Sequence, residues 1–299
     1  MVYESPLVYA LGVEGLALLR ALLDDGDRGA VESRLAEIRG LLGDDSLTRV
    51  AGDVDRVDTL TGYRVWSPTY DEPGNPAFDT DEPVIIDILD TLPAGDALDA
   101  ACGTGRIARL LADRGHRVLG VDSSPEMLAR ARTRVPEGSF QLGDLTALPA
   151  PSGETDLVVC ALALTHVPDL APALAEFVRV LRPGGHVVLS DMHPESVLRG
   201  WIPSTGDADG RPARVISYRH SVGDYLRAAL SVGLRPMRCE EPVREPPSTS
   251  AVTPPDPAIV AEVLNEPRVW PWCPSVLVPQ ASRAADAGVP AGLIWHLQR

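Results

Sequence analysis

The chain has 299 residues, of which 44% are hydrophobic and 23% are charged; these are values of a globular protein, so disordered, collagen-like and coiled-coil classes are excluded. It carries 42 acidic against 27 basic side chains, a formal net charge of −15, which disfavours general binding to nucleic acid or to anionic membranes. All 27 basic residues are arginine, and without lysine the chain can form neither a Schiff base nor a Walker-type phosphate loop.

The cysteines are too far apart for a CxxC pair, which argues against a zinc ribbon and a thioredoxin motif. No cluster of His, Cys, Asp and Glu has metal-ligand spacing, so we expect no metal. We find no charged leader with a cleavage site, and no apolar run that approaches the ~20 residues needed to span a bilayer. We therefore expect a cytoplasmic protein with no membrane or nucleic acid partner, and leave a homodimer open.

From residue 6 to about residue 47, apolar residues recur at three- and four-residue spacing, which predicts two helices. The polar residues 24–27 separate them. Residues 62–83 are crowded with Pro, Gly and Asp and include several aromatic residues, so we expect a loop with little regular structure there.

Between residues 84 and 191, short apolar runs alternate with amphipathic ones, which is the pattern of parallel βαβ units on a central sheet. The predicted strands are residues 97–100, 117–122, 139–144, 156–164 and 186–191. They lack the in/out alternation of an exposed antiparallel sheet, so we expect them to be buried on both faces.

Three further elements, a strand, a helix and a strand, are predicted at residues 213–220, 222–233 and 234–242. Residues 243–290 are rich in proline, and residues 291–299 again have the pattern of an apolar strand. We therefore expect a helical cap with a covering loop at 1–83, a core at 84–242 and 291–299, and a lid insertion at 243–290.

The sharpest motif is LDAACGTG and the residues that follow it. A predicted strand ends near Asp99, a turn with Gly103 and Gly105 follows, and the next strand ends at Asp122. Glycine lets the backbone approach a ligand closely, and the helix that begins after the turn offers free N–H groups. The carboxylate of Asp122 is placed to accept both hydroxyls of a ribose. Taken alone, this motif also fits the NAD-binding fingerprint.

Three other features favour a different ligand. Asp99 is suited to hold an ammonium group such as a methionyl amine, whereas it would repel a pyrophosphate. Asp144 ends the third strand, where its carboxylate can accept the amino group of adenine. Residues 181–185, with the sequence LRPGG, make a tight turn into the fifth strand.

With these motifs the chain resembles the class I S-adenosylmethionine-dependent methyltransferases, in the small-molecule branch that includes ubiquinone-type and natural-product tailoring enzymes. The resemblance covers about residues 84–191 and, more weakly, the chain beyond. It implies an α/β fold with a seven-stranded Rossmann-like sheet whose last strand is antiparallel, with an N-terminal helical cap and a C-terminal lid insertion. It also implies that S-adenosylmethionine is bound by Tyr70, Asp99, Ala101, Gly103, Gly105, Asp122, Ser123, Asp144, Leu145 and Ala161.

A weakly acidic acceptor hydroxyl needs a base during methyl transfer. Near-neutral imidazoles suited to that task are expected at His166, His193 and His220. Asp191 and Glu195 flank His193 and are candidates to orient it. The alternative for each histidine is a loop residue that orients a turn, and the two carboxylates would then be solvated loop charges.

Aromatic residues are concentrated outside the core: of the fourteen in the chain, only Phe140 and Phe177 lie between residues 91 and 191. Such side chains could line a pocket for a flat, apolar molecule, or pack small subdomains. The candidates for acceptor binding are Trp66, Trp201, Tyr218, Trp270 and Trp272. Tyr70 joins the catalytic candidates, because similar enzymes have a Tyr-Asp pair before the core that closes over the cofactor.

The resemblance implies a methyltransferase that acts on a small, aromatic, natural-product-like acceptor at O, N or C, including an electron-rich ring carbon such as that of an indole. Two alternatives stay open. One is a protein of this fold that binds S-adenosylmethionine but catalyses another reaction or senses the cofactor. The other, an NAD-dependent oxidoreductase, is disfavoured by Asp99 and the turn at 181–185.

Overall fold

The structure, a computed structural model, describes residues 1–24, 27–49, 51–72, 75–206, 211–243 and 277–299. The chain divides into two compact units. The core unit consists of Thr59–Pro194, Ser217–Val243 and Pro290–Arg299. The accessory unit consists of Met1–Asp58, Glu195–Ile216 and Arg244–Val289.

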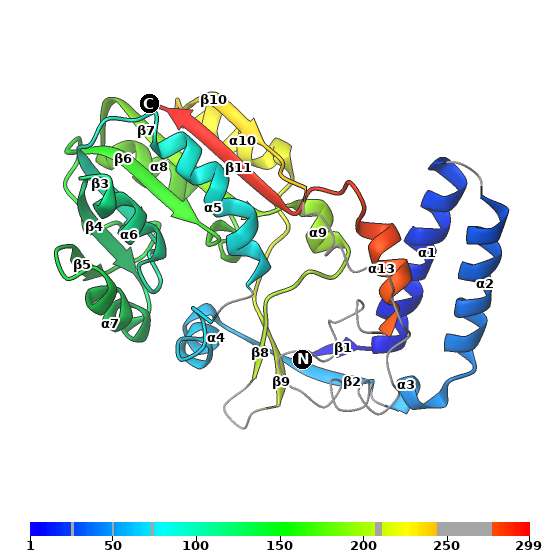
Figure 1. The fold of residues 1–299 in the computed structure, drawn as a ribbon. Coiled ribbons are helices and arrows are strands. Elements are labelled where there is room, and N and C mark those ends of the chain that lie inside the picture. The colour runs from blue at the N-terminus through cyan, green and yellow to red at the C-terminus, as the bar shows by residue number, and fades with distance from the viewer. Residues whose placement is uncertain (25–26, 50, 73–74, 207–210, 244–276) are drawn as a thin grey trace. The chain divides into compact units, whose positions relative to one another are not determined.

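The core unit contains a seven-stranded sheet with the strand order β10-β11-β7-β6-β3-β4-β5 (Figure 1). Its strands are β3 (Asp96–Ala100), β4 (Arg117–Asp122), β5 (Ser139–Leu142), β6 (Thr155–Ala161), β7 (Leu181–Met192), β10 (Arg235–Glu240) and β11 (Gly292–Gln298). Strands β7, β6, β3, β4 and β5 are parallel, and β11 is antiparallel to both of its neighbours, β7 and β10. The expected α/β sheet with an antiparallel last strand is confirmed.

Helices cover both faces of this sheet, and its central strands β3, β6 and β7 are accordingly apolar on both sides. The helices of the core unit are α4 (Thr59–Trp66), α5 (Pro76–Leu89), α6 (Arg106–Asp113), α7 (Pro125–Arg134), the 3₁₀-helix η1 (Leu164–His166), α8 (Leu170–Val180) and α10 (Val222–Ser231). One buried cluster joins Leu98 of β3 to Phe177 of α8 and Tyr225 of α10. A second cluster joins Ala97, the neighbour of Leu98 in β3, to Ile85 of α5.

The loop expected at residues 62–83 is wrong in part, because α4 ends at Trp66 and α5 begins at Pro76. The side chain of Asn75 accepts a hydrogen bond from the N–H of Ala77, and Pro76 occupies the first turn. Proline fits there because its missing N–H would have no partner in the helix. The segment rich in Pro and Asp, which the sequence suggested to be a loop, therefore contains the start of α5.

The accessory unit has its own small sheet, of order β1-β2-β9-β8, which the sequence patterns did not predict. Its elements are β1 (Val2–Glu4), α1 (Pro6–Asp24), α2 (Arg28–Leu42), α3 (Asp45–Arg49), β2 (Gly52–Val57), α9 (Pro194–Leu198, whose first residue belongs to the core unit), β8 (Ser204–Gly206), β9 (Pro212–Val215) and α13 (Pro279–Asp286). The strand expected at 213–220 corresponds to β9, which ends at Val215 and pairs in parallel with β2.

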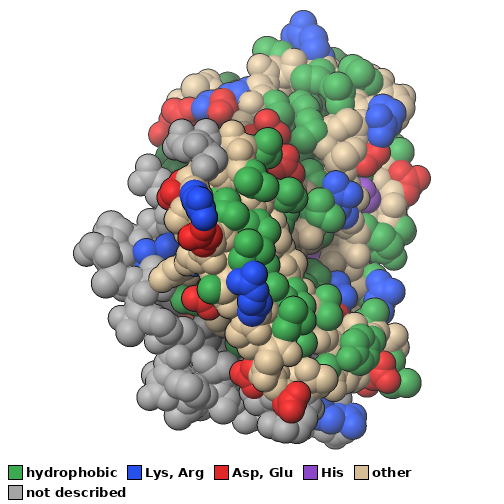
Figure 2. All heavy atoms as spheres, turned by 90° about the vertical axis from the view of Figure 1, so that its right-hand side faces the viewer, with side chains coloured by type: hydrophobic (Ala, Val, Ile, Leu, Met, Phe, Trp, Pro, Cys, Tyr) green, Lys and Arg blue, Asp and Glu red, His purple; other side chains and the backbone are tan. Residues whose placement is uncertain are grey.

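Helix α1 corrects the expectation that no apolar run approaches membrane-spanning length: Pro6–Leu23 is long and apolar enough to span a membrane, judged by length and composition alone. One such helix is weak evidence, because helices of soluble proteins pass the same test. One face of α1 packs through Ala10, Val13 and Ala17 against α13. Figure 2 shows hydrophobic side chains among the charged ones on one face of the molecule.

A buried ion pair ties α1 to α2. Arg34 is 7% exposed and Glu14 is fully buried, and their side chains are 3.1 Å apart. Arg34 also donates to the side chain of Gln280 in α13 over 2.8 Å. Burial raises the pKa of Glu14, although Arg34 opposes this shift. Arg34 thus compensates a carboxylate that could not otherwise stay ionised among apolar helices.

We expect Arg34→Ala to lower the free energy of unfolding by about 3–5 kcal/mol, because it leaves the charge of Glu14 buried without its partner. Urea unfolding followed by circular dichroism measures this. The control is Arg28→Ala in the same helix, which removes an exposed pair with Glu32 and should cost less than about 1 kcal/mol. Equal losses in the two variants would contradict the role assigned to the buried pair.

Candidate active site

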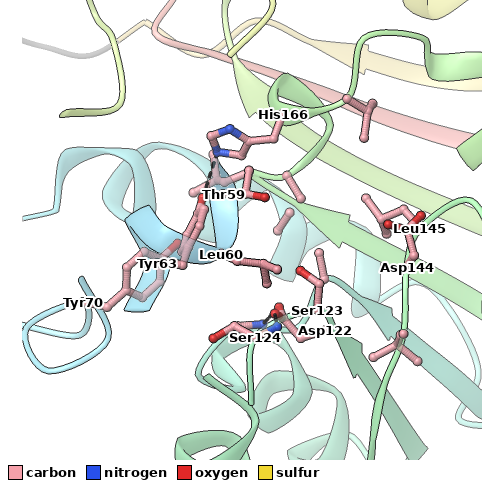
Figure 3. A pocket seen from close by; sticks show the side chains of 18 residues that line it. Thr59, Leu60, Tyr63, Tyr70, Asp122, Ser123, Ser124, Asp144, Leu145 and His166 are labelled. Atoms are coloured by element: carbon pink, nitrogen blue, oxygen red, sulfur yellow. Dashed lines mark hydrogen bonds between the residues drawn. The ribbon is translucent and has the colours of Figure 1, made fainter. Parts of the chain in front are cut away.

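A cavity of about 180 Å³ lies at the carboxyl ends of the central strands of the core unit (Figure 3). It joins the last residues of β4 and β6 and the loops after β3, β4, β5 and β6 to residues from α4 and the segment after it. Its lining consists of Thr59, Leu60, Tyr63, Tyr70, Ala101, Gly103, Val121, Asp122, Ser123, Ser124, Gly143, Asp144, Leu145, Ala161, Leu162, Ala163, His166 and Val167. Most of the residues expected to bind the cofactor therefore line one cavity.

The glycine turn after β3 uses its two glycines differently. Both have left-handed backbones, with φ of +51° at Gly103 and +82° at Gly105. A Cβ on Gly103 would meet no atom within 4 Å, whereas a Cβ on Gly105 would lie 3.1 Å from the Cα of Ala131 in α7. Gly103 therefore borders open space, and Gly105, which does not line the cavity, permits close packing of α7.

Asp122 connects the two loops that border the cavity. One carboxylate oxygen accepts the N–H of Gly103 and the other accepts the N–H of Ser124, each over 2.8 Å. Burial raises the pKa of Asp122, and these backbone donors oppose the shift. Each carboxylate oxygen can accept more than one hydrogen bond, so the side chain can hold both loops and still receive ligand hydroxyls.

Asp99 lies beneath the glycine turn, 1% exposed, and is not part of the cavity lining. Its Oδ2 has no hydrogen-bond partner among the described residues. Burial raises its pKa to about 7, although the N–H of Ala108 opposes this. An incompletely satisfied carboxylate is costly unless a ligand supplies a donor or a positive charge.

The Tyr-Asp pair is fixed to the glycine turn. Asp71 accepts a hydrogen bond from the hydroxyl of Thr104 over 2.7 Å and forms an ion pair with Arg134 of α7 over 2.8 Å. Tyr70 consequently lines the cavity, where its ring packs against Tyr63 with centroids 5.8 Å apart. Burial raises the pKa of Tyr70 to about 12, so it remains a neutral phenol.

Of the three candidate histidines, His166 is the one that lines the cavity. Its Nε2 is 3.0 Å from the hydroxyl of Tyr63, and the two rings meet edge to face (Figure 3). Burial raises the pKa of Tyr63 well above its ordinary value, so this phenol keeps its proton. Tyr63 was not among the residues predicted from the sequence, although Trp66 and Tyr70 of the same expected loop were, because its partner His166 lies 103 positions away in the chain.

The other two histidines lie outside the cavity lining. His193 is 3% exposed, and its Nε2 is 2.9 Å from the carboxylate of Glu241. His220 places its Nε2 2.8 Å from the carbonyl oxygen of Val167. The carboxylate of Asp191, expected beside His193, instead accepts hydrogen bonds from the N–H of Thr165, the N–H of Met192 and the hydroxyl of Tyr225.

The aromatic candidates for acceptor binding are dispersed. Trp66 packs edge-on against Tyr63, with centroids 5.1 Å apart, outside the cavity lining. Tyr218 is hydrogen-bonded through its backbone to Thr165. Trp201 belongs to the accessory unit. Trp270 and Trp272, in the expected lid at 243–290, lie outside the described residues. Within the described part of the chain, no group of three His, Cys, Asp or Glu residues is arranged to hold a metal ion.

Comparison with known proteins agrees with this geometry. Residues 98–189 match a family described as "Methyltransferase domain". The chain is 38% identical over 116 residues to malonyl-[acyl-carrier protein] O-methyltransferase of Serratia marcescens, which covers 39% of this chain and 44% of that protein. It is 41% identical over 108 residues to 2-methyl-6-phytyl-1,4-hydroquinone methyltransferase of Synechocystis, covering 34% of each. The chain thus spans less than half the length of these relatives.

Solved structures show the same fold. A DhpI structure in complex with SAH has a TM-score of 0.53 and 23% identity, covering 80% of this chain and 93% of that one. An S-adenosylmethionine-dependent methyltransferase from Mesorhizobium loti has a TM-score of 0.50 and 24% identity, covering 75% and 100%. Residues 98–189 therefore form a methyltransferase domain, on the fold of class I S-adenosylmethionine-dependent methyltransferases, and S-adenosylmethionine is the cofactor of that domain.

The residues present fit this cofactor. Gly103 leaves open space where a ligand can meet the backbone, and Asp122 offers carboxylate oxygens for a ribose at the cavity wall. Asp144, whose Oδ1 accepts both donors of Thr146, lines the same cavity and keeps its second oxygen for an amino group. The unpartnered oxygen of Asp99 suits an ammonium group held beneath the turn.

Substitution of the two glycines should separate binding from folding. Gly103→Leu fills the cavity, so we expect its affinity for S-adenosylhomocysteine to fall at least ~100-fold, at a stability cost of about 1 kcal/mol from backbone strain. Gly105→Ala should instead cost about 1–3 kcal/mol, because its Cβ presses on Ala131. Calorimetry and urea unfolding measure the two effects. Wild-type affinity in Gly103→Leu would contradict this assignment.

The buried carboxyl group of Asp99 should make both the stability of the protein and its affinity for the cofactor depend on pH. Its folded pKa is about 7, above the unfolded value of about 3.9, so its contribution to stability is present at low pH and lost as the pH rises through 7. We expect Asp99→Asn to raise the unfolding temperature at pH 8 by roughly 5 °C. Affinity for S-adenosylhomocysteine should increase from pH 6 to pH 8 in the wild type, and be weak and nearly constant in the variant. If the affinity of Asp99→Asn changed with pH in parallel with that of the wild type, Asp99 would not be the partner of the cofactor's amine.

Proposed function

We propose that the protein is an S-adenosylmethionine-dependent methyltransferase whose acceptor is a small, uncharged molecule with a hydroxyl group. The observation that carries this proposal is the single cavity that joins the cofactor-binding residues to the Tyr63–His166 pair. A reacting methyl group and a proton acceptor would then face the same small space, which is the arrangement that transfer to a hydroxyl needs.

The charges of the lining favour an uncharged acceptor. The 18 lining residues include the carboxylates Asp122 and Asp144 but no arginine, and the chain has no lysine. An acceptor with a phosphate or carboxylate group would therefore meet no arginine or lysine side chain in this lining and would be repelled by the two carboxylates. Leu60, Tyr63 and Leu162 provide apolar and aromatic contact for a flat ring. Of the relatives' acceptors, the hydroquinone is closer to this chemistry than the malonyl group.

Tyr63 and His166 form a proton relay in the proposed mechanism. In the tautomer with its proton on Nδ1, His166 accepts the hydroxyl proton of Tyr63 at Nε2, and Tyr63 accepts the proton of the acceptor hydroxyl. The pKa of Tyr63 is raised, so its proton leaves only as another arrives. His166 ends as the imidazolium, a charge that imidazole carries readily near neutral pH.

S-adenosylmethionine, when bound, supplies a methyl group on a positively charged sulfur. The acceptor oxygen would take this methyl group, the sulfur would keep the electron pair of the C–S bond, and the acceptor's proton would end on His166. Tyr70 and Asp71 restrict the entry of water by fixing the segment after α4 to the glycine turn. Positioning supplies most of the rate in such a direct displacement.

The proposal is tested by offering the protein radiolabelled S-adenosylmethionine and a series of phenols whose hydroxyl pKa values decrease stepwise. We expect His166→Ala and Tyr63→Phe to lower kcat by roughly 10²–10⁴-fold with weakly acidic phenols. The loss should shrink with nitrophenols, which are already ionised. Affinity for S-adenosylhomocysteine should stay within about threefold, because neither residue is assigned to the cofactor.

The matched control is His186→Gln. His186 lies in β7 beside Leu157 and contacts His296, outside the cavity lining, so kcat should not change. Faster transfer to carboxylate or phosphate acceptors than to any phenol would overturn the proposed acceptor class. Tight binding of S-adenosylhomocysteine without transfer to any acceptor would favour the alternative, a protein that senses the cofactor or uses it in another reaction.

A further inference from the structure

His166 lies in a short turn, residues 162–167, whose conformation depends on contacts from outside it. The backbone of Leu162 is left-handed, with φ of +58°, which is strained for a branched side chain. The 3₁₀-helix η1 that follows has three residues. Its own support includes the bonds from the N–H of His166 to Ala163 over 3.0 Å and from the N–H of Val167 to Leu164 over 3.1 Å. A turn this short depends on contacts from outside it.

The main external contact is a buried carboxylate. Asp191, at the end of β7, is 2% exposed. Its Oδ2 accepts the N–H of Thr165, the residue before His166, over 2.6 Å. The same oxygen accepts the hydroxyl of Tyr225 in α10 over 2.9 Å, and Oδ1 accepts the N–H of Met192 over 2.8 Å. The turn is thereby connected to a strand of the sheet and to a helix beneath it.

A second set of contacts comes from the segment before α10. The N–H of Tyr218 donates to the carbonyl of Thr165 over 2.7 Å, and the hydroxyl of Thr165 donates to the carbonyl of Tyr218 over 3.2 Å. The Nε2 of His220 donates to the carbonyl of Val167 over 2.8 Å. Thr165 and Val167, on either side of His166, are therefore both held, and Asp191 and His220 do not line the cavity.

We propose that Asp191 is a positioning residue, which with Tyr225 and His220 fixes the 162–167 turn so that the ring of His166 stays within reach of Tyr63 and the acceptor. This inference rests on the proposed relay. It gives Asp191 and His220 a role different from proton transfer: neither touches the reacting atoms, and both act through the turn. A shift of the turn would lengthen the 3.0 Å contact on which the relay depends.

The experiment compares Asp191→Asn and Tyr225→Phe with the wild type at pH 8. That pH lies above the pKa of Asp191, which burial raises to about 6, so the wild-type side chain is ionised. We expect kcat to fall about 10–100-fold in Asp191→Asn and about threefold to tenfold in Tyr225→Phe, with affinity for S-adenosylhomocysteine unchanged. Placed in a His166→Ala background, Asp191→Asn should have no further effect on kcat, because the group it positions is gone.

Asp224→Asn is the matched control. Asp224 caps α10, the helix that carries Tyr225, through Ser221, and its side chain is 42% exposed. The variant therefore loses a carboxylate and some stability but no contact that an Asp224 side chain makes with the turn. Its kcat should equal that of the wild type. If Asp191→Asn lowers kcat by the same factor with and without His166, or if Asp224→Asn matches it, Asp191 is only a structural residue and the inference fails.

A second measurement separates this inference from the proposed function. The Cε1 resonance of His166, identified by its loss in His166→Ala, is observed by NMR in protein saturated with S-adenosylhomocysteine. We expect Asp191→Asn to shift this resonance and Asp224→Asn to leave it in place. An unshifted resonance overturns the positioning role. If the resonance shifts but His166→Ala retains full activity, the positioning holds and the proposed relay is what fails.

Discussion

The backbone hydrogen bonds of Asp122 are the constraint on which the cofactor side of the site depends. β3 and β4 are parallel neighbours, so their loops leave the sheet side by side with N–H groups that have no strand partner. Asp122 accepts one N–H from each loop, and removing it would leave both unsatisfied near a buried sheet. Thr104 and Asp71 then attach the segment with Tyr70 to the turn that Asp122 has fixed.

Several carboxyl groups in and near the site are buried, and burial disfavours their ionised form. Burial raises the pKa values of Asp99, Asp122 and Asp191, and Asp81, whose pKa is also raised, stays paired with Arg106. Asp122 and Asp191 are compensated by hydrogen-bond donors of the fold, whereas Asp99 keeps a buried oxygen without a partner among the described residues, which is costly for an ionised carboxylate. A cofactor whose ammonium group pairs with Asp99 would supply the missing partner, so part of its binding free energy would come from relief of a cost already present in the fold.

The sequence predicted the sheet well because local rules govern it, and the contacts of the proposed relay less well because they are long-range. β4 has the expected bounds, Arg117–Asp122, because a short apolar run between two polar turns predicts where the strand begins and ends. The contact between Tyr63 and His166 joins residues 103 positions apart, and no periodicity encodes it. His166, His193 and His220 were all candidates from the sequence, yet tertiary geometry alone decides that His166 lines the cavity. The strands β1 and β8 have three residues each, too few to show an alternation.

The two sides of the site consequently differ in how they are held. On the side proposed for the cofactor, the backbone of the glycine turn would itself form the binding surface, and its shape follows from strand pairing and left-handed glycines. On the side proposed for the acceptor, α4 and the 162–167 turn are short, and side-chain bonds from Asp191, Thr165 and Tyr63 fix them. A change of acceptor therefore requires only new side chains on short segments, while the cofactor-binding backbone stays as it is. The same physics explains why sequence motifs identify the cofactor and not the acceptor: a backbone conformation leaves a glycine pattern, whereas a network of side-chain bonds leaves none.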